Sequence, residues 1–127
     1  MEKSENILEK KTLVMGASLK PERYSNKAIK SLRKHGLETI AVGLREGQVE
    51  DVVITKAGEM FTDIHTITVY VGADRLADSI DYLLSLKPKR IIFNPGAENP
   101  EFAKRAKEQG IEIVQACTLV MLATDQY

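Results

Sequence analysis

The segment Thr12-Leu13-Val14-Met15-Gly16-Ala17-Ser18 constrains the fold of this chain more than any other. Its apolar run is typical of a buried parallel strand, and Gly16 then permits an abrupt turn. We predict that a helix follows from Ser25 or Asn26. A strand, a glycine turn and a helix make the first half of a βαβ nucleotide-binding unit, in which backbone amides and the helix N-terminus approach a phosphate. Anion binding is therefore the first function to consider.

The loop between this turn and the helix carries the residues expected to hold the anion. Gly16 stands alone, without the G-x-G-x-x-G run of a dinucleotide site. The loop from Ala17 to Tyr24 is longer than most connections between a strand and a helix. It contains one hydroxyl, on Ser18, and two cations, Lys20 and Arg23. This combination suits a phosphate-rich ligand, bound by the loop amides and the two cations.

The rest of the chain alternates between strand and helix patterns, which predicts a parallel sheet covered on both faces. We therefore expect an α/β, Rossmann-like, doubly wound fold, with a mostly parallel sheet of five to six strands in a three-layer αβα arrangement. Residues 1–127 form one domain in this interpretation. The predicted strands are 11–15, 37–42, 52–55, 66–71, 90–93 and 111–114, and the predicted helices are 25–34, 74–86 and 100–109.

Several shorter features accompany these elements. Ser25, Asp74 and Asn99 are predicted helix N-caps. Residues 1–10 are expected to form a short helix or arm on the sheet edge, 59–65 a turn of helix, and 117–123 a short apolar helix or extended tail. No helical pattern occurs between the second strand and the strand at 52–55, so the usual crossover helix is expected to be missing there.

The end of the second strand discriminates between nucleotides. An NAD site has an acidic residue there that binds the ribose hydroxyls. This chain instead has Val42-Gly43-Leu44-Arg45, with Glu46 only afterwards. A cation at this position can pair with a phosphate on the ribose. The pattern therefore disfavours NAD and leaves NADP and coenzyme A (CoA), both of which carry an extra ribose phosphate.

The turns after the predicted strands should meet at the carboxyl edge of the sheet, where open α/β sheets bind ligands. Gly72 follows the strand at 66–71, and Asn94-Pro95-Gly96 follows the strand at 90–93. The predicted ligand-binding residues are thus Gly16, Ala17, Ser18, Lys20, Arg23, Ser25, Asn26, Val42, Gly43, Arg45, Gly72, Asn94, Pro95 and Gly96.

Composition argues against several other functions. Lys plus Arg equals Asp plus Glu at 18 each, so no overall field attracts nucleic acid or an anionic membrane. No apolar run approaches the length of a membrane span and the N-terminus lacks a signal core, so we expect a cytoplasmic protein. One cysteine, Cys117, and two histidines, His35 and His65, offer no disulfide and no evident metal site. No residue is predicted to be catalytic.

The chain also resembles a known family, the small stand-alone CoA-binding domain proteins related to the nucleotide-binding domain of succinyl-CoA synthetase. The resemblance rests on Val14-Met15-Gly16-Ala17-Ser18, on the loop with Pro21, Arg23 and Ser25, on Ile91 to Gly96 with Glu98-Asn99, and on Ala116 to Leu122. It implies a Rossmann-like fold with the pyrophosphate on the first loop and the adenosine beside the second strand. One departure is Val42-Gly43-Leu44, where family members commonly have valine, asparagine and proline.

These observations predict a binding module for CoA or an acyl-CoA without catalysis of its own. Two alternatives remain at this stage: a metabolite sensor that binds NADP(H) or NAD(H), and the nucleotide-binding component of a multi-chain acyl-CoA synthetase. The expected partner is a small-molecule nucleotide rather than nucleic acid or a membrane. The apolar residues Leu119 to Leu122 are a candidate homodimer surface, although we expect their burial within the monomer.

Overall fold

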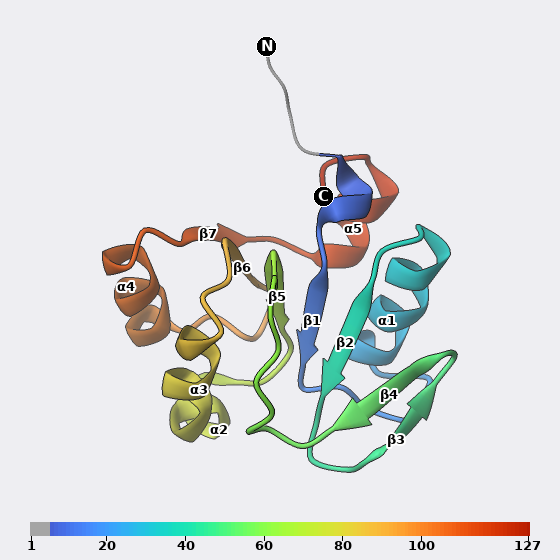
Figure 1. The fold of residues 1–127 in the computed structure, drawn as a ribbon, viewed down its shortest axis with the longest axis horizontal. Helices are drawn as coiled ribbons and strands as arrows, with labels where there is room; N and C mark the ends of the chain where they lie inside the picture. The colour runs from blue at the N-terminus through green and yellow to red at the C-terminus, as the bar shows by residue number, and fades with distance from the viewer. Residues whose placement is uncertain (1–5) are drawn as a thin grey trace.

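The fold is built on a seven-stranded sheet in the order β3-β4-β2-β1-β5-β6-β7 (Figure 1). The computed structural model describes residues 6–127. The strands are β1 (Thr12–Met15), β2 (Thr39–Val42), β3 (Gly47–Val49), β4 (Val52–Thr55), β5 (Thr66–Val69), β6 (Arg90–Phe93) and β7 (Glu112–Gln115). All neighbouring strands pair in parallel except β3, which is antiparallel to β4. The predicted Rossmann-like α/β fold is confirmed.

Strand β1 lies at the centre of the sheet and pairs with β2 on one side and β5 on the other. Met15, its last residue, is in register with Val42 of β2 and with Val69 of β5. Without β3, the strand order is the doubly wound order of a Rossmann fold. The order reverses direction at β1, and open α/β sheets bind ligands in the crevice at such a switch point.

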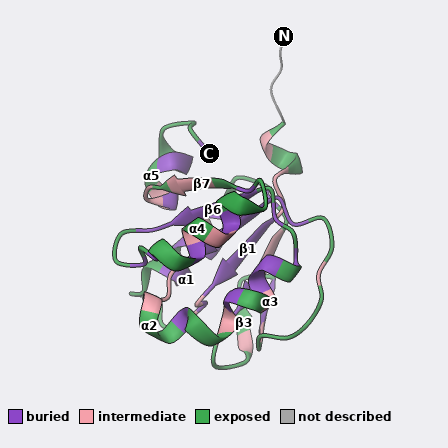
Figure 2. Ribbon diagram, turned by 90° about the vertical axis from the view of Figure 1, so that its left-hand side faces the viewer, coloured by how far each residue is buried: buried purple, intermediate pink, exposed green. Residues whose placement is uncertain are grey.

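Helices cover both faces of the sheet (Figure 1). One core joins α1, α5 and the sheet, and the other joins α2, α3, α4 and the sheet. Figure 2 shows the same division, with buried strands inside and helices whose outer faces are exposed. The helical elements are η1 (Ile7–Glu9), α1 (Tyr24–Lys34), α2 (Ala73–Leu76), η2 (Ala77–Ser79), α3 (Ile80–Ser85), α4 (Pro100–Glu108) and α5 (Thr118–Ala123).

Three details of the predicted strands and loops were wrong. Strand β3 was missed, because its three residues, Gly47 to Val49, are too few to show an alternating pattern. It forms a hairpin with β4 in place of a crossover helix, and the predicted absence of that helix is confirmed. Residues 59–65 form no helix, and the strand predicted to end at residue 71 ends at Val69.

Two helix starts were also placed wrongly. The N-cap of α1 is Arg23 rather than Ser25, which is buried inside the first helical turn. The N-cap of α2 is Gly72 rather than Asp74, which lies in the first turn. The helix predicted over 74–86 is interrupted by η2, whose sequence Ala-Asp-Ser contains two weak helix formers.

Other local predictions are confirmed. The side chain of Asn99 accepts a hydrogen bond from the amide of Phe102, and Pro100 occupies the first position of α4. Residues 118–123 form a helix, and its Met121 and Leu122 enter the core, while Val120 is exposed. Of the predicted N-terminal arm, residues 1–5 lie outside the described residues, and η1 forms a short helix.

The aromatic pair Phe93 and Phe102 provides a test of the core. The two rings meet edge to face at 5.4 Å between centroids, and both are fully buried. Phe102→Ala should lower the free energy of unfolding by about 3–5 kcal/mol because it leaves a cavity between β6 and α4. Urea denaturation would measure this change. Val53→Ala, on an exposed position of β4, is the control and should change stability by no more than about 0.5 kcal/mol.

Candidate functional site

A cleft of about 1020 Å³ lies where the carboxyl ends of β1, β2, β4 and β5 meet. This volume is at the upper end of the range for small-molecule and cofactor sites. Eleven of the fourteen predicted binding residues line it, namely Gly16, Ala17, Ser18, Lys20, Arg23, Ser25, Val42, Gly43, Arg45, Pro95 and Gly96. The other three, Asn26, Gly72 and Asn94, are not among its lining residues. Most of the residues predicted from the sequence thus line this one cleft, and three of them do not.

The first loop is fastened to the end of β2 at one carbonyl. The amides of Gly16 and Ala17 both donate to the Val42 oxygen, at 2.8 and 2.9 Å. These two amides were expected to bind phosphate, and in this structure both already donate to the neighbouring strand. Gly16 has a φ of +95°, and a Cβ atom there would lie 2.5 Å from Val71 Cγ2, so the turn requires glycine.

Gly43 is required for the same junction. A Cβ atom at this position would lie 2.4 Å from the Ala17 carbonyl oxygen. The Gly43 amide in turn donates to Thr55 O of β4 at 2.9 Å, so β1, β2 and β4 are tied together at their carboxyl ends. The departure of Val42-Gly43-Leu44 from the family pattern therefore has a packing reason: any side chain at residue 43 would push the first loop away from β2.

Helix α1 presents an uncapped N-terminus to this cleft. Its N-cap, Arg23, makes no side-chain capping hydrogen bond, and no acidic residue lies in the first turn. The loop before α1 is fixed to the helix by buried Asn26, whose Nδ2 donates to the Ser18 carbonyl at 2.9 Å. The Ser18 hydroxyl accepts from the Lys20 amide at 3.1 Å. The first amides of α1 thus remain available to an anion, as the N-terminus of a helix favours.

The side chain of Asn94 makes hydrogen bonds within the core and does not line the cleft. It is fully buried, and its Nδ2 donates to Thr68 Oγ1 at 2.7 Å and to the Val69 carbonyl at 3.0 Å. Its Oδ1 accepts from the Thr118 amide at 2.8 Å, which ties β6 to the start of α5. Pro95 and Gly96 follow it into the cleft wall, where the Gly96 amide is taken by the Glu98 carboxylate.

Charge is divided between the two sides of the cleft. Lys20 and Arg23 come from the first loop, and Arg45 and Lys56 come from the ends of β2 and β4. The opposite wall, beyond β5, carries Asp74, Arg75 and Asp78 of α2 and η2. The cations beside β1, β2 and β4 attract an anionic group, and the two carboxylates beyond β5 repel it. An anion is therefore favoured on the side of β1, β2 and β4.

Sequence reasoning missed several residues of the cleft. Lys56 follows β4 directly, so the rule that ligands bind at the carboxyl edge could have identified it. Exposed apolar side chains of Leu19, Tyr24 and Leu44 also line the cleft, and periodicity gives no signal for them because they lie in loops or at a helix start. Tyr70 lines it as well, and burial raises the pKa of its phenol.

Comparison with known proteins identifies the family. The model of the CoA binding domain family matches residues 10–123. The chain belongs to this CoA-binding domain family. No curated protein matches it.

Solved structures agree with that assignment. The structure of an uncharacterized protein is 42% identical over 93% of this chain and 98% of its own, with a TM-score of 0.90. A hypothetical protein from Pyrococcus horikoshii OT3 is 25% identical over 91% of this chain and 82% of its own, with a TM-score of 0.82. A protein from Thermus thermophilus is also 25% identical, over 95% and 93%, with a TM-score of 0.77. The family supports CoA as the general ligand class.

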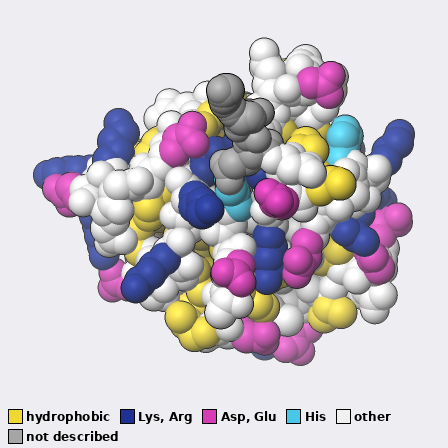
Figure 3. Space-filling view, turned by 45° about the horizontal axis from the view of Figure 1, so that its top comes forward, with side chains coloured by type: hydrophobic (Ala, Val, Ile, Leu, Met, Phe, Trp, Pro, Cys, Tyr) yellow, Lys and Arg dark blue, Asp and Glu magenta, His cyan; other side chains and the backbone are white. Residues whose placement is uncertain are grey.

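The remaining surface shows no second concentration of charge in the view of Figure 3. There the Lys and Arg side chains are interspersed with Asp and Glu. Within residues 6–127, no helix is long and apolar enough to cross a membrane. No group of three or more His, Cys, Asp or Glu residues in the same range could hold a metal ion. Cys117, His35 and His65 are not among the residues that line the cleft.

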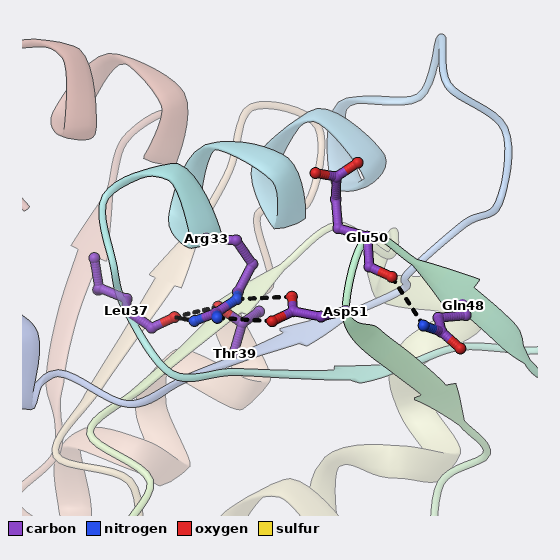
Figure 4. Close-up of polar contacts among 6 residues, drawn as sticks. All are labelled: Arg33, Leu37, Thr39, Gln48, Glu50 and Asp51. Carbon is purple, nitrogen blue, oxygen red and sulfur yellow. Dashed lines mark hydrogen bonds and ion pairs between the residues drawn. The ribbon is translucent and has the colours of Figure 1, made fainter.

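The hairpin that forms one end of the cleft is anchored to α1 (Figure 4). Arg33 donates from Nε and Nη2 to the two carboxylate oxygens of Asp51, at 2.9 and 2.8 Å, and from Nη1 to the Leu37 carbonyl at 2.7 Å. Within the hairpin, Gln48 donates to the Glu50 carbonyl at 2.9 Å. Two parallel hydrogen bonds between a guanidinium and a carboxylate fix the relative orientation of the two groups as well as their distance. The hydrogen bonds to Arg33 hold the pKa of Asp51 below its ordinary value.

This ion pair predicts a pH dependence. Because the pKa of Asp51 is lowered in the folded state, its stabilising contribution is present above the unfolded pKa and is lost as the pH falls through the folded pKa. Asp51→Asn should therefore be less stable than the wild type at pH 7, and the two should converge as the pH falls below about 4. Urea denaturation across this range would measure it. Asp125→Asn, which removes an exposed carboxylate elsewhere, should show no such convergence.

A glycine pair tests the junction of the first loop with β2. Gly43→Ala should destabilise the protein by about 1–3 kcal/mol, because the added methyl group overlaps the Ala17 carbonyl. Gly72→Ala is the matched control, since a Cβ atom there meets nothing within 4 Å and the φ of −62° is ordinary. Thermal or urea unfolding would compare the two. Equal effects of both substitutions would contradict the proposed role of Gly43.

Proposed function

We propose that this protein binds CoA or an acyl-CoA in the cleft at the carboxyl edge of its sheet and catalyses no reaction itself. The observation that carries the proposal is the uncapped N-terminus of α1, which opens into the cleft together with Lys20 and Arg23. Amide donors and two cations at one helix start favour a pyrophosphate. Membership of the CoA-binding domain family supports this ligand class.

The charges of the cleft give the bound ligand a direction. Phosphates belong on the side of Lys20, Arg23 and Arg45, where α1 also begins. The pantetheine arm, which is uncharged, then extends toward β5 and the wall that carries Asp74 and Asp78. This orientation places the most anionic part of the ligand away from both carboxylates, and it leaves any acyl group at the β5 end.

NADP(H) remains the second candidate, and one observation favours it. The end of β2 carries Arg45 instead of an acid, and an arginine near this position accommodates the ribose phosphate of NADP in related folds. A sensor of this kind would change its partner or its oligomeric state on binding. A component of an acyl-CoA synthetase would instead co-purify with an ATP-grasp partner. Size-exclusion chromatography with and without each nucleotide would also test for a homodimer.

Isothermal titration at low salt tests the binding of CoA, acetyl-CoA, NADPH and NADH. We expect the CoA compounds to bind most tightly, and Lys20→Ala and Arg23→Ala each to weaken them by about tenfold through loss of a charge-assisted contact. Lys107→Ala, on the exposed face of α4 and outside the cleft, is the control and should bind as the wild type does.

Three outcomes would contradict parts of this proposal. Failure of both CoA and acetyl-CoA to bind would refute the CoA module. Tighter binding of NADPH would favour the nucleotide sensor. Consumption of acetyl-CoA by the purified protein, followed by loss of the thioester absorbance, would refute the absence of catalysis.

A further inference from the structure

Two cations, Arg45 before β3 and Lys56 after β4, lie at the open end of the hairpin and line the cleft. The last pair of its antiparallel ladder places Gly47 opposite Ile54. The ladder ends at this pair. Arg45 lies in a bend two residues before Gly47, and Lys56 lies two residues after Ile54, so both belong to the open end of the hairpin. Arg45 and Lys56 both line the cleft, which agrees with this placement.

Nothing in the described part of the chain neutralises these two cations. The ion pairs among residues 6–127 join Lys11 to Glu38, Arg33 to Asp51 and Arg105 to Asp81. Glu46, the acid next to Arg45, takes part in none of them. Like charges on one wall of a cleft repel each other. An anion held between Arg45 and Lys56 would relieve that repulsion.

The place of this pair in the fold identifies the anion. The Gly43 amide donates to the Thr55 carbonyl, so the residues after β2 and after β4 leave the sheet side by side. In Rossmann folds the residue after the second strand contacts the ribose of the bound nucleotide. The pyrophosphate is provided for separately, by α1 and the first loop. The anion between Arg45 and Lys56 is therefore a phosphate carried on the ribose.

We propose that Lys56 and Arg45 together bind the ribose phosphate of the nucleotide and so select CoA over dephospho-CoA, which lacks that group. This inference rests on the proposed function and adds to it a specificity residue, Lys56, from a strand outside the first βαβ unit. It also requires the hairpin itself, because the hairpin replaces the crossover helix and brings the two cations together.

The test compares two pairs of ligands by isothermal titration at low salt. CoA is compared with dephospho-CoA, and adenosine 3′,5′-bisphosphate with adenosine 5′-monophosphate. We expect the wild type to prefer the ligand with the ribose phosphate by about tenfold in each pair. Lys56→Ala and Arg45→Ala should each reduce that preference to about threefold, and the double variant should abolish it. Lys56→Arg keeps the charge and should retain the preference.

The controls separate this inference from the proposed function. Lys107→Ala should leave the preference unchanged, whereas Lys20→Ala should weaken CoA and dephospho-CoA equally, because the loop cation faces the shared pyrophosphate. Equal binding of CoA and dephospho-CoA by the wild type would overturn the role of Lys56 while leaving the CoA module intact. So would a Lys56→Ala variant that weakens both ligands to the same extent.

Discussion

The paired hydrogen bonds from Gly16 and Ala17 to the Val42 carbonyl are the contact on which the cleft depends. They fix the first loop against the end of β2, and Gly43 permits this approach because it has no side chain. The loop then has one position from which to start α1. Both amides take part in this junction, so a phosphate bound in the cleft would have to use the start of the helix and the side-chain cations instead.

Local signals were read correctly where the sequence alone decides the structure. The Asn99-Pro100 start of α4 is one case, because the cap and the first helical residue lie next to each other in the chain. The βαβ alternation likewise gave the Rossmann-like fold and most of the cleft. Ser25 and Asp74 were misplaced as caps, because the sequence offers several residues able to start a helix and only tertiary packing chooses among them.

Two features that sequence reasoning missed depend on contacts between distant segments. The occupied amides of the first loop could not be foreseen without the position of Val42. Asn94 was predicted to face a ligand, but Thr68 and Thr118 from two other elements satisfy it in the core. Lys56 is a different case, because it directly follows the predicted strand at 52–55 and the carboxyl-edge rule could have identified it.

The ion pair between Arg33 and Asp51 connects the two elements whose other ends border the cleft. Helix α1 begins at the first loop, and close to its C-terminal end Arg33 binds Asp51 at the tip of the hairpin. The other end of the hairpin leads to Lys56. The ion pair thus joins the end of α1 that lies away from the cleft to the tip of the hairpin, so the distance between the start of α1 and Lys56 is set by these two elements. For a nucleotide bound as proposed, secondary structure would therefore set the spacing between its two phosphate sites, independently of how either phosphate is held.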